Sequence, residues 1–299
     1  MTTVFVSGSF DNLRSRHVRF LEEAAKLGEL HVLLWSDEIA RRLEGKVPRF
    51  PPSERQYLVE AVRYVNHVTL VTEAASSDDL TGHPGHPTAL SASVASNPSG
   101  HPLTWAVDET DATPAKRAFC AARGLTYRVF TAADLAGFPG DGDQEAGGRG
   151  QGSGVSRPSP VAGRPFVLVT GCYDWLHSGH VRFFEEASLY GDLYVVAGND
   201  ANVRHLKGEG HPLQTQDERR YMIGAIRYVK QALVSTGWGW LDAEPEIARL
   251  RPDIYLVNED GDKPDKREFC EAHGLRYVVL KRTPKAGLPR RSSTDLRGF

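Results

Sequence analysis

Hydrophobic and polar residues alternate in blocks along the second half of the chain. Short apolar runs predict buried strands at 166–170, 193–197, 232–235, 254–258 and 277–280. The segments between them have helical spacing, as in Val181, Phe184 and Ala187, and they predict helices at 180–190, 217–229, 244–250 and 265–273. Strands alternating with helices indicate an α/β fold with a doubly wound parallel sheet, which binds ligands at the carboxyl ends of its strands.

Three sequence blocks of the first half return in the same order in the second half. GSFDNLRSRHVRFLEEA at 8–24 matches GCYDWLHSGHVRFFEEA at 171–187, an offset of 163 residues. SERQYLVEAVRYV at 53–65 matches DERRYMIGAIRYV at 217–229, and PAKRAFCAARGLTY at 114–127 matches PDKREFCEAHGLRY at 264–277. Because the period is as long as a domain, it predicts tandem duplication of one domain and not a solenoid.

The boundaries of the two domains follow from composition. Residues 140–163 are rich in Gly, Ser and Pro, which is typical of a flexible linker that buries no core. They divide the chain into a first domain at 1–139 and a second at 164–299. The first domain carries about 14 extra residues in the segment 73–102, where we expect a long surface loop.

The overall composition is ordinary for a soluble globular protein. The chain has 299 residues, 40% of them hydrophobic and 25% charged, and a formal net charge of −2. This balance gives no general attraction to nucleic acid or to an anionic membrane, so we expect neither as a partner. The three cysteines and the lack of a signal peptide or an apolar spanning run predict a cytoplasmic protein.

Two histidines mark the candidate site of chemistry. His177 and His180 follow the first strand of the second domain and enter a helix, whose free N–H groups favour phosphate. Gly179 lets the backbone approach a ligand closely. The two imidazoles, three residues apart, are positioned to stabilise charge on a phosphorus during transfer. In isolation, the pair would be better explained by one histidine capping the helix and the other lying on the surface.

The surrounding residues favour the functional interpretation. The stretch GCYDWLHSGHVRFFEEA resembles the cytidylyltransferase-like nucleotidyltransferase superfamily, whose signature is a glycine, an aromatic residue and an acid followed by His-x-Gly-His. The resemblance covers nearly all of 164–299 and continues in order through four further motifs: Asn199-Asp200, Arg204–Gly208 with Pro212, Glu218-Arg219 with Arg227-Tyr228-Val229, and Arg282-Thr283 with Ser292–Leu296. It implies two tandem Rossmann-like domains, an arrangement similar to that of ethanolamine-phosphate cytidylyltransferases.

The resemblance also implies roles for individual residues. The catalytic set is His177, His180 and Lys207. Nucleotide-binding positions are Gly171, Cys172, Tyr173, Gly179, Arg219, Arg282, Ser292, Ser293 and Thr294. Asp174 reaches the acceptor, although a turn-stabilising role explains it equally well. For Arg282, a surface ion pair is the alternative to the nucleotide-binding role. Mg²⁺ accompanies the nucleoside triphosphate, and no protein ligand to a metal is expected.

Two tryptophans are candidates for the acceptor pocket. Trp238 and Trp240 stand in Gly-Trp-Gly-Trp just after a predicted strand, where loops carry function. A packed aromatic corner is the competing interpretation.

The first domain lacks the elements that handle phosphate. Arg14 replaces His177, Arg16 replaces Gly179 and Glu44 replaces Lys207, and no Ser-Ser-Thr motif follows. We therefore expect a degenerate domain that pairs with the second in an intramolecular pseudo-dimer, using one patch on both partners. The alternative is that Arg14 and Arg16 bind another anion.

The sequence thus predicts an enzyme acting on small molecules. It would transfer CMP from CTP to a phospho-alcohol, sugar phosphate or phosphonate by in-line attack, releasing pyrophosphate. One alternative is an adenylyltransferase that uses ATP on a sugar phosphate, because the segment from Asn199 to Gly208 also resembles enzymes of the ADP-heptose type. The other is a non-catalytic nucleotide-binding protein.

Overall fold

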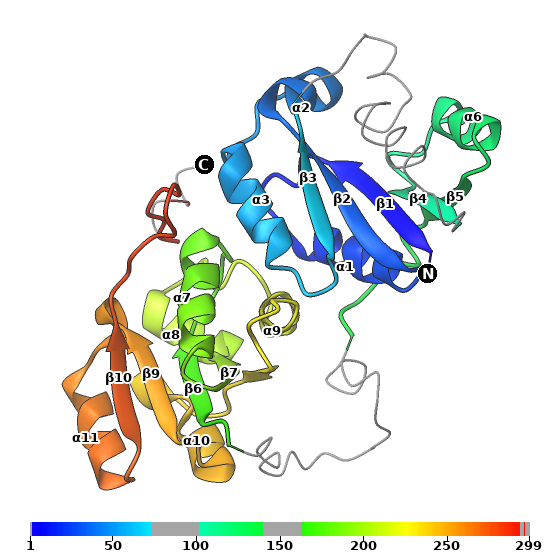
Figure 1. Cartoon of the computed structure of the whole chain (residues 1–299). Helices are drawn as coiled ribbons and strands as arrows, with labels where there is room; N and C mark the ends of the chain where they lie inside the picture. Colours follow the sequence, from blue (N-terminus) through cyan, green and yellow to red (C-terminus); the bar gives the residue numbers. More distant parts are fainter. Residues whose placement is uncertain (1, 73–101, 140–162, 294–295, 297–299) are drawn as a thin grey trace. The chain divides into compact units, whose positions relative to one another are not determined.

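The computed structural model describes residues 2–72, 102–139, 163–293 and 296, which form two compact units that divide between Gly137 and Phe138. Each unit contains one five-stranded parallel sheet (Figure 1). Almost all of the predicted linker and of the long loop of the first domain lies outside the described residues. No helix in the described part of the chain is both long enough and apolar enough to cross a membrane. The pseudo-dimer stays a prediction.

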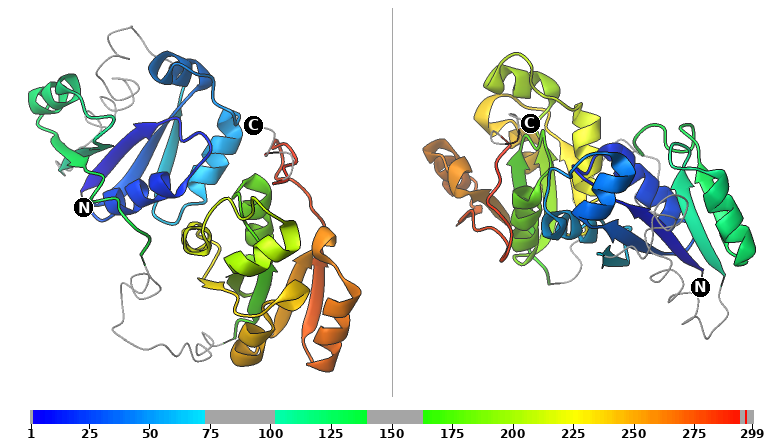
Figure 2. Two further views of the ribbon diagram at one scale, coloured as in Figure 1. Left: turned by 180° about the vertical axis from the view of Figure 1, so that it is seen from behind. Right: turned by 90° about the horizontal axis from the view of Figure 1, so that it is seen from above.

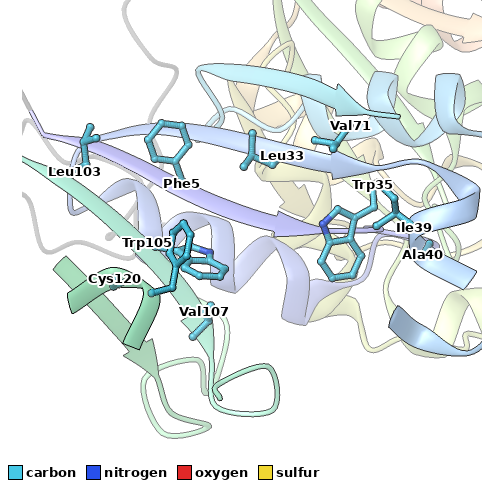
Figure 3. Close-up of a cluster of buried hydrophobic side chains, with 11 residues drawn as sticks. Phe5, Leu33, Trp35, Ile39, Ala40, Val71, Leu103, Trp105, Val107 and Cys120 are labelled. Atoms are coloured by element: carbon cyan, nitrogen blue, oxygen red, sulfur yellow. The ribbon is translucent and has the colours of Figure 1, made fainter. Parts of the chain in front are cut away.

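The first unit has the strand order β3-β2-β1-β4-β5. Its strands are β1 (Thr3–Gly8), β2 (Glu29–Trp35), β3 (His67–Val71), β4 (Leu103–Asp108) and β5 (Thr126–Phe130). Its described helices are α1 (Ser15–Ala25), α2 (Asp37–Glu44), α3 (Pro52–Glu60) and α6 (Pro114–Ala122). The core includes a cluster of strand and helix side chains around Phe5, Leu33, Trp35 and Trp105 (Figure 3).

The second unit has the strand order β10-β9-β6-β7-β8, which is equivalent to that of the first. Its strands are β6 (Phe166–Gly171), β7 (Asp192–Ala197), β8 (Gln231–Val234), β9 (Ile254–Asn258) and β10 (Arg276–Leu280). Its helices are α7 (Ser178–Ser188), α8 (Asp200–Lys207), α9 (Gln216–Gly224), α10 (Glu244–Leu250) and α11 (Pro264–Ala272), with short 3₁₀ turns η1 (Gly239–Leu241) and η2 (Glu259–Gly261). The predicted α/β fold class with two doubly wound parallel sheets is confirmed.

The helices of the second unit differ from the prediction mainly at α9 and α8. The predicted helix at 217–229 is α9, which ends at Gly224, a residue of low helix propensity; the chain then turns to bury Ile226 and Val229. The sequence pattern did not predict α8, because Asn202 and Val203 are its only two buried residues.

The order in which strands are added to the second sheet reverses at its central strand, β6. From β6 the chain moves through β7 to β8, and then returns to β9 and β10 on the other side of β6. Because such crossovers are right-handed, α7 and α9 cover one face and α10 and α11 cover the other (Figures 1 and 2). On the second face, Leu168 packs with Ile247, Leu250 and Cys270. The carboxyl ends of β6 and β9 therefore meet at a topological switch point, where such sheets bind ligands.

A buried arginine holds the loops at this end of the second sheet. The side chain of Arg219, on α9, has no exposed surface. It donates to the carbonyls of Cys172 at 2.7 Å and Gln214 at 3.1 Å, and pairs with Asp200 at 2.7 Å. In the first unit, Arg55 is equally buried and donates to four oxygens in the same way, those of Ser9, Trp35, Phe50 and Asp37.

We expect the substitution Arg219→Ala to destabilise the second unit. It leaves two carbonyls and the Asp200 carboxylate without their cation. The free energy of unfolding should fall by about 3 kcal/mol, the lower end for removing one partner of a buried ion pair, because Asp200 remains partly exposed. Urea unfolding measures the change. The matched control is Arg204→Ala on the exposed face of α8, which should stay within about 0.5 kcal/mol of the parent. Equal effects of the two substitutions would contradict the structural role of Arg219.

Candidate active site

A cavity of about 300 Å³ lies at the switch point of the second sheet. Thr170 and Gly171 at the end of β6 line it, as do Val257 and Asn258 at the end of β9. Nine of the predicted site residues also line it: Gly171, Cys172, Tyr173, His177, His180, Lys207, Arg282, Ser292 and Ser293. The structure therefore brings together residues from β6, α7, α8 and the C-terminal segment.

The two histidines meet at the start of α7. His177 is the N-cap residue, with φ −141° and ψ 172°, and His180 lies one turn further along. Their rings stack with centroids 3.9 Å apart and an angle of 22° between planes. Both line the cavity. The spacing of three residues thus places two imidazoles together beside the N–H groups of a helix N-terminus, where an anion is stabilised.

Gly179 is required by the ring of His177. A side chain at position 179 would place its Cβ 3.0 Å from Cε1 and Nδ1 of His177 and 3.2 Å from the carbonyl oxygen of Arg291. The Gly179 N–H donates to Nδ1 of His177 at 3.1 Å, so the neutral ring carries its proton on Nε2. The small residue between the histidines therefore lets the chain pack against the first imidazole. Its backbone N–H sets the tautomer of that ring.

His180 has a strongly perturbed pKa. Its pKa lies well below the ordinary value of 6.5, mainly because burial disfavours the charged ring, and further because His177, Arg282 and Lys207 lie nearby. Part of the ring faces the cavity, but protein surrounds the rest and excludes most of the water. Burial therefore favours the neutral imidazole form of His180.

Cations predominate among the charged residues that line this cavity. Lys207, Lys266 and Arg282 line it, and in the described part of the chain Asp260 is the one carboxylate among them. Lys207 is the last residue of α8. Lys266 lies on α11, where burial lowers its pKa. An anionic ligand with several charges matches this set.

The C-terminal segment is tied to the cavity through Arg282. Its guanidinium pairs with Asp260 at 2.8 Å and donates to the carbonyl of Arg291 at 2.9 Å. That bond positions the next two residues, Ser292 and Ser293, at the edge of the cavity. Arg282 thus forms the ion pair of the rival interpretation and also lines the cavity, and its role in nucleotide binding stays a prediction. Thr294 lies outside the described residues.

The predicted acceptor residue Asp174 faces backbone rather than the cavity. Its carboxylate accepts from the N–H groups of Leu213 at 2.6 Å and Gln214 at 3.0 Å, and lies 3.1 Å from Nδ1 of His211. In the first unit, Asp11 accepts from two backbone N–H groups in the same way. Asp174 therefore stabilises a loop, which corrects the placement that the resemblance implied. Arg219 likewise does not line the cavity, because its guanidinium is bonded to the loops and to Asp200.

The two tryptophans of the Gly-Trp-Gly-Trp segment lie outside the cavity lining and are each 59% exposed. Asn202 holds the segment through two hydrogen bonds with the backbone of Gly239, at 2.7 and 3.1 Å. Trp238 stacks on His205 of α8 with centroids 4.7 Å apart, and Trp240 lies 5.4 Å from Nζ of Lys263. They do not form a packed aromatic corner.

Sequence reasoning missed several lining residues, among them Asn258, Asp260 and Lys266. A signal existed for Lys266, because a lysine occupies the same place in the repeated blocks that begin PAK and PDK. Asn258 and Asp260 carried no motif, and their position follows from the strand order. No group of three or more His, Cys, Asp or Glu side chains suited to a metal occurs in the described segments.

Comparison with known proteins finds nucleotidyltransferases. Residues 168–299 match the family model described as cytidylyltransferase-like. The bifunctional protein HldE of Geobacter sulfurreducens is 35% identical over 144 residues, which are 47% of this chain and 29% of that protein. The chain thus spans less than a third of the length of HldE. An FAD synthase of Aciduliprofundum boonei is 32% identical over 135 residues, which are 44% of this chain and 83% of the synthase.

Among solved structures, the chain is similar to a lipopolysaccharide core biosynthesis protein from Thermoplasma volcanium. The two are 24% identical, with a TM-score of 0.35, and the match covers 41% of this chain and 99% of that one.

We expect the ring of His180 to stay neutral over the range in which an ordinary histidine titrates. Its ¹⁵N ring signals should not change between about pH 8 and about pH 6, with His180→Gln used for assignment. In the unfolded chain the ring takes up a proton near 6.5, so the stability that the neutral ring contributes is present above that pH and is lost as the pH falls below it. Titration of His180 near 6.5 would contradict the burial argument.

Proposed function

Because the chain belongs to the cytidylyltransferase-like nucleotidyltransferase superfamily, we propose that its second unit transfers a nucleoside monophosphate from a nucleoside triphosphate to a small phosphorylated acceptor and releases pyrophosphate. One observation carries the proposal: two stacked imidazoles at a helix N-terminus face a cavity that Lys207, Lys266 and Arg282 also line. A triphosphate needs such an arrangement, because several donors and cations must act on one chain of phosphates.

The proposed reaction needs no covalent enzyme intermediate. An oxygen of the acceptor phosphate attacks the α-phosphorus, and the bond between that phosphorus and the bridging oxygen of the β-phosphate breaks as the new bond forms. His177 donates from Nε2, and His180 takes up a proton when phosphate charge enters beside it. Lys207 and Arg282 balance charge on the oxygens, while Ser292 and Ser293 donate hydroxyl hydrogen bonds to the leaving pyrophosphate.

Mg²⁺ fits this site as part of the nucleotide substrate. Its preferred ligands are phosphate oxygens, carboxylates and water. Among the described lining residues the one carboxylate, Asp260, is paired with Arg282. The ion would therefore be held mainly by the phosphates, and its contribution is to neutralise their charge.

Two donor nucleotides remain candidates within this proposal. The sequence motifs favour CTP, by the resemblance to cytidylyltransferases. The similarity to an FAD synthase, whose named product contains an adenylyl group, supports ATP at least as well. A matrix of CTP, ATP, GTP and UTP against phosphorylated alcohols, sugars, phosphonates and FMN, read by pyrophosphate release, distinguishes the two. Absence of release in every combination would favour the non-catalytic alternative.

With the best substrate pair, we expect His177→Ala and His180→Ala each to reduce turnover by about 10²- to 10³-fold, the usual cost of removing one preorganised donor. Lys207→Ala should mainly weaken triphosphate binding, and more than Ser293→Ala, because it removes a full charge. Steady-state pyrophosphate release and calorimetry measure the two effects. The control is Lys230→Ala at the amino end of β8, remote from the cavity. Near-normal turnover of both histidine variants would refute the catalytic assignment.

The exposed tryptophans support an acceptor site beside the cavity. Trp238 stacks on α8, which ends in Lys207, and Trp240 contacts the residue at the start of α11, which carries Lys266. Each aromatic ring is thus attached to an element that brings a lysine to the cavity. We expect Trp238→Ala to raise the KM of the acceptor more than that of the nucleotide. Leu189→Ala, at an exposed site beyond the far end of α7, should change neither. An equal rise in both constants would count against the acceptor role.

A further inference from the structure

The first unit contains a cavity at the switch point of its own sheet. Its volume is about 500 Å³, against about 300 Å³ in the second unit. Ser7 and Gly8 at the end of β1 and Asp108 at the end of β4 line it, in the places that Thr170, Gly171 and Asn258 occupy in the second unit. The volume is in the range of small-molecule sites. Loss of the phosphate-handling residues has therefore not filled the cavity.

The charge around this cavity is opposite to that of the second unit. Four carboxylates and three cations line it in the described part of the chain, whereas one carboxylate and three cations line the second cavity. Glu44 stands where the second unit has Lys207. Lys116 is already paired with Asp111. A triphosphate would meet repulsion here, while a ligand with hydroxyl groups would find acceptors in Glu44 and in Oδ2 of Asp108, whose Oδ1 already accepts from Thr110 and Asp111.

His17, the one histidine of the motif kept in the first unit, does not supply the missing positive charge. Burial and the neighbouring Arg16 lower its pKa to about 4. The ring is therefore neutral near pH 7, and its Nδ1 accepts the N–H of Arg14 at 3.1 Å. The remaining cations near it, Arg16 and Lys46, are exposed at the rim.

Two polar groups in the lining are buried and have no hydrogen-bond partner among the described residues. They are the indole Nε1 of Trp35 (Figure 3), a side chain 7% exposed, and Oγ of Ser7. In the second unit a glycine, Gly198, replaces Trp35, and the counterpart of Ser7 is bonded, since Thr170 lies 2.8 Å from the hydroxyl of Tyr255. Buried polar groups without a partner are uncommon in proteins, and because these two line a cavity, a ligand in it would supply the missing partners.

We propose that this cavity binds a nucleoside without phosphates. The aromatic rings of Phe10 and Phe20 line it and offer flat surfaces to a base. The indole N–H of Trp35 donates to a ring nitrogen or carbonyl of the base. Glu44 and Asp108 accept from the ribose hydroxyls, as acidic residues do in dinucleotide-binding folds. The first unit is thereby a nucleoside-binding domain attached to a nucleotide-using one.

Calorimetry on the full chain tests the proposal with adenosine and cytidine as ligands. We expect one of them to bind, and Trp35→Phe to weaken that binding about three- to tenfold, because it removes one hydrogen-bond donor and keeps a ring. Glu44→Lys should weaken it about tenfold. The matched control is Trp105→Phe, since the Trp105 indole N–H is also buried without a described partner but does not line the cavity. Lys207→Ala should leave nucleoside affinity unchanged.

A second measurement guards against a variant that fails to fold. Nucleoside should change the fluorescence of the parent and of Trp105→Phe, and that change should be absent in Trp35→Phe. Three outcomes overturn the proposal. The first is that neither nucleoside binds, and the second is that binding responds to neither Trp35→Phe nor Glu44→Lys. The third is that ATP or glucosamine binds more tightly than the nucleosides and that this tighter binding depends on Glu44. Loss of pyrophosphate release in the histidine variants leaves these readouts unaffected, so failure of the two proposals is distinguishable.

Discussion

The geometry of the second unit depends on the hydrogen bonds that the guanidinium of Arg219 donates. It joins three segments that are far apart in sequence: the loop after β6, the loop before α9 and the first turn of α8. The loop after β6 leads into His177, and α8 ends in Lys207. A planar group with five donors is suited to satisfying several buried oxygens at fixed angles. A residue outside the cavity lining therefore fixes the segments that carry the imidazoles and the lysine.

Comparison of the two units separates scaffold from chemistry. The buried arginine and the loop-binding aspartate are present in both, as Arg219 with Asp174 and as Arg55 with Asp11. Charged residues at the cavity differ, and the change from Lys207 to Glu44 reverses a full charge. Stability of the fold resides in groups that face backbone, whereas ligand preference resides in groups that face the cavity. One set can therefore change without loss of the other.

The fold was largely predictable from the sequence, and the site in part. Strands buried on both faces form short apolar runs, so all five strands of the second unit lie where the pattern places them. The meeting of His177 with His180 follows from helical spacing alone. The direction in which Asp174 points does not, because a carboxylate that binds backbone and one that faces a ligand have the same sequence. Lys266 enters the cavity through the strand order, which no local pattern contains. Trp238 and Trp240 are exposed because Asn202 holds the chain between them, a contact between distant segments.

The low pKa of His180 has a consequence for anion discrimination. A permanently charged pair of imidazoles would attract chloride, sulfate and inorganic phosphate at all times. A buried imidazole that is neutral at rest gains its proton only when enough negative charge enters to offset the cost of burying the cation. Nucleotide binding would then be coupled to proton uptake, and its affinity would decline as the solution becomes more alkaline. Under the proposed function, the cavity would select for ligands that carry several charges close together, and simple salts in the surroundings would compete poorly for it.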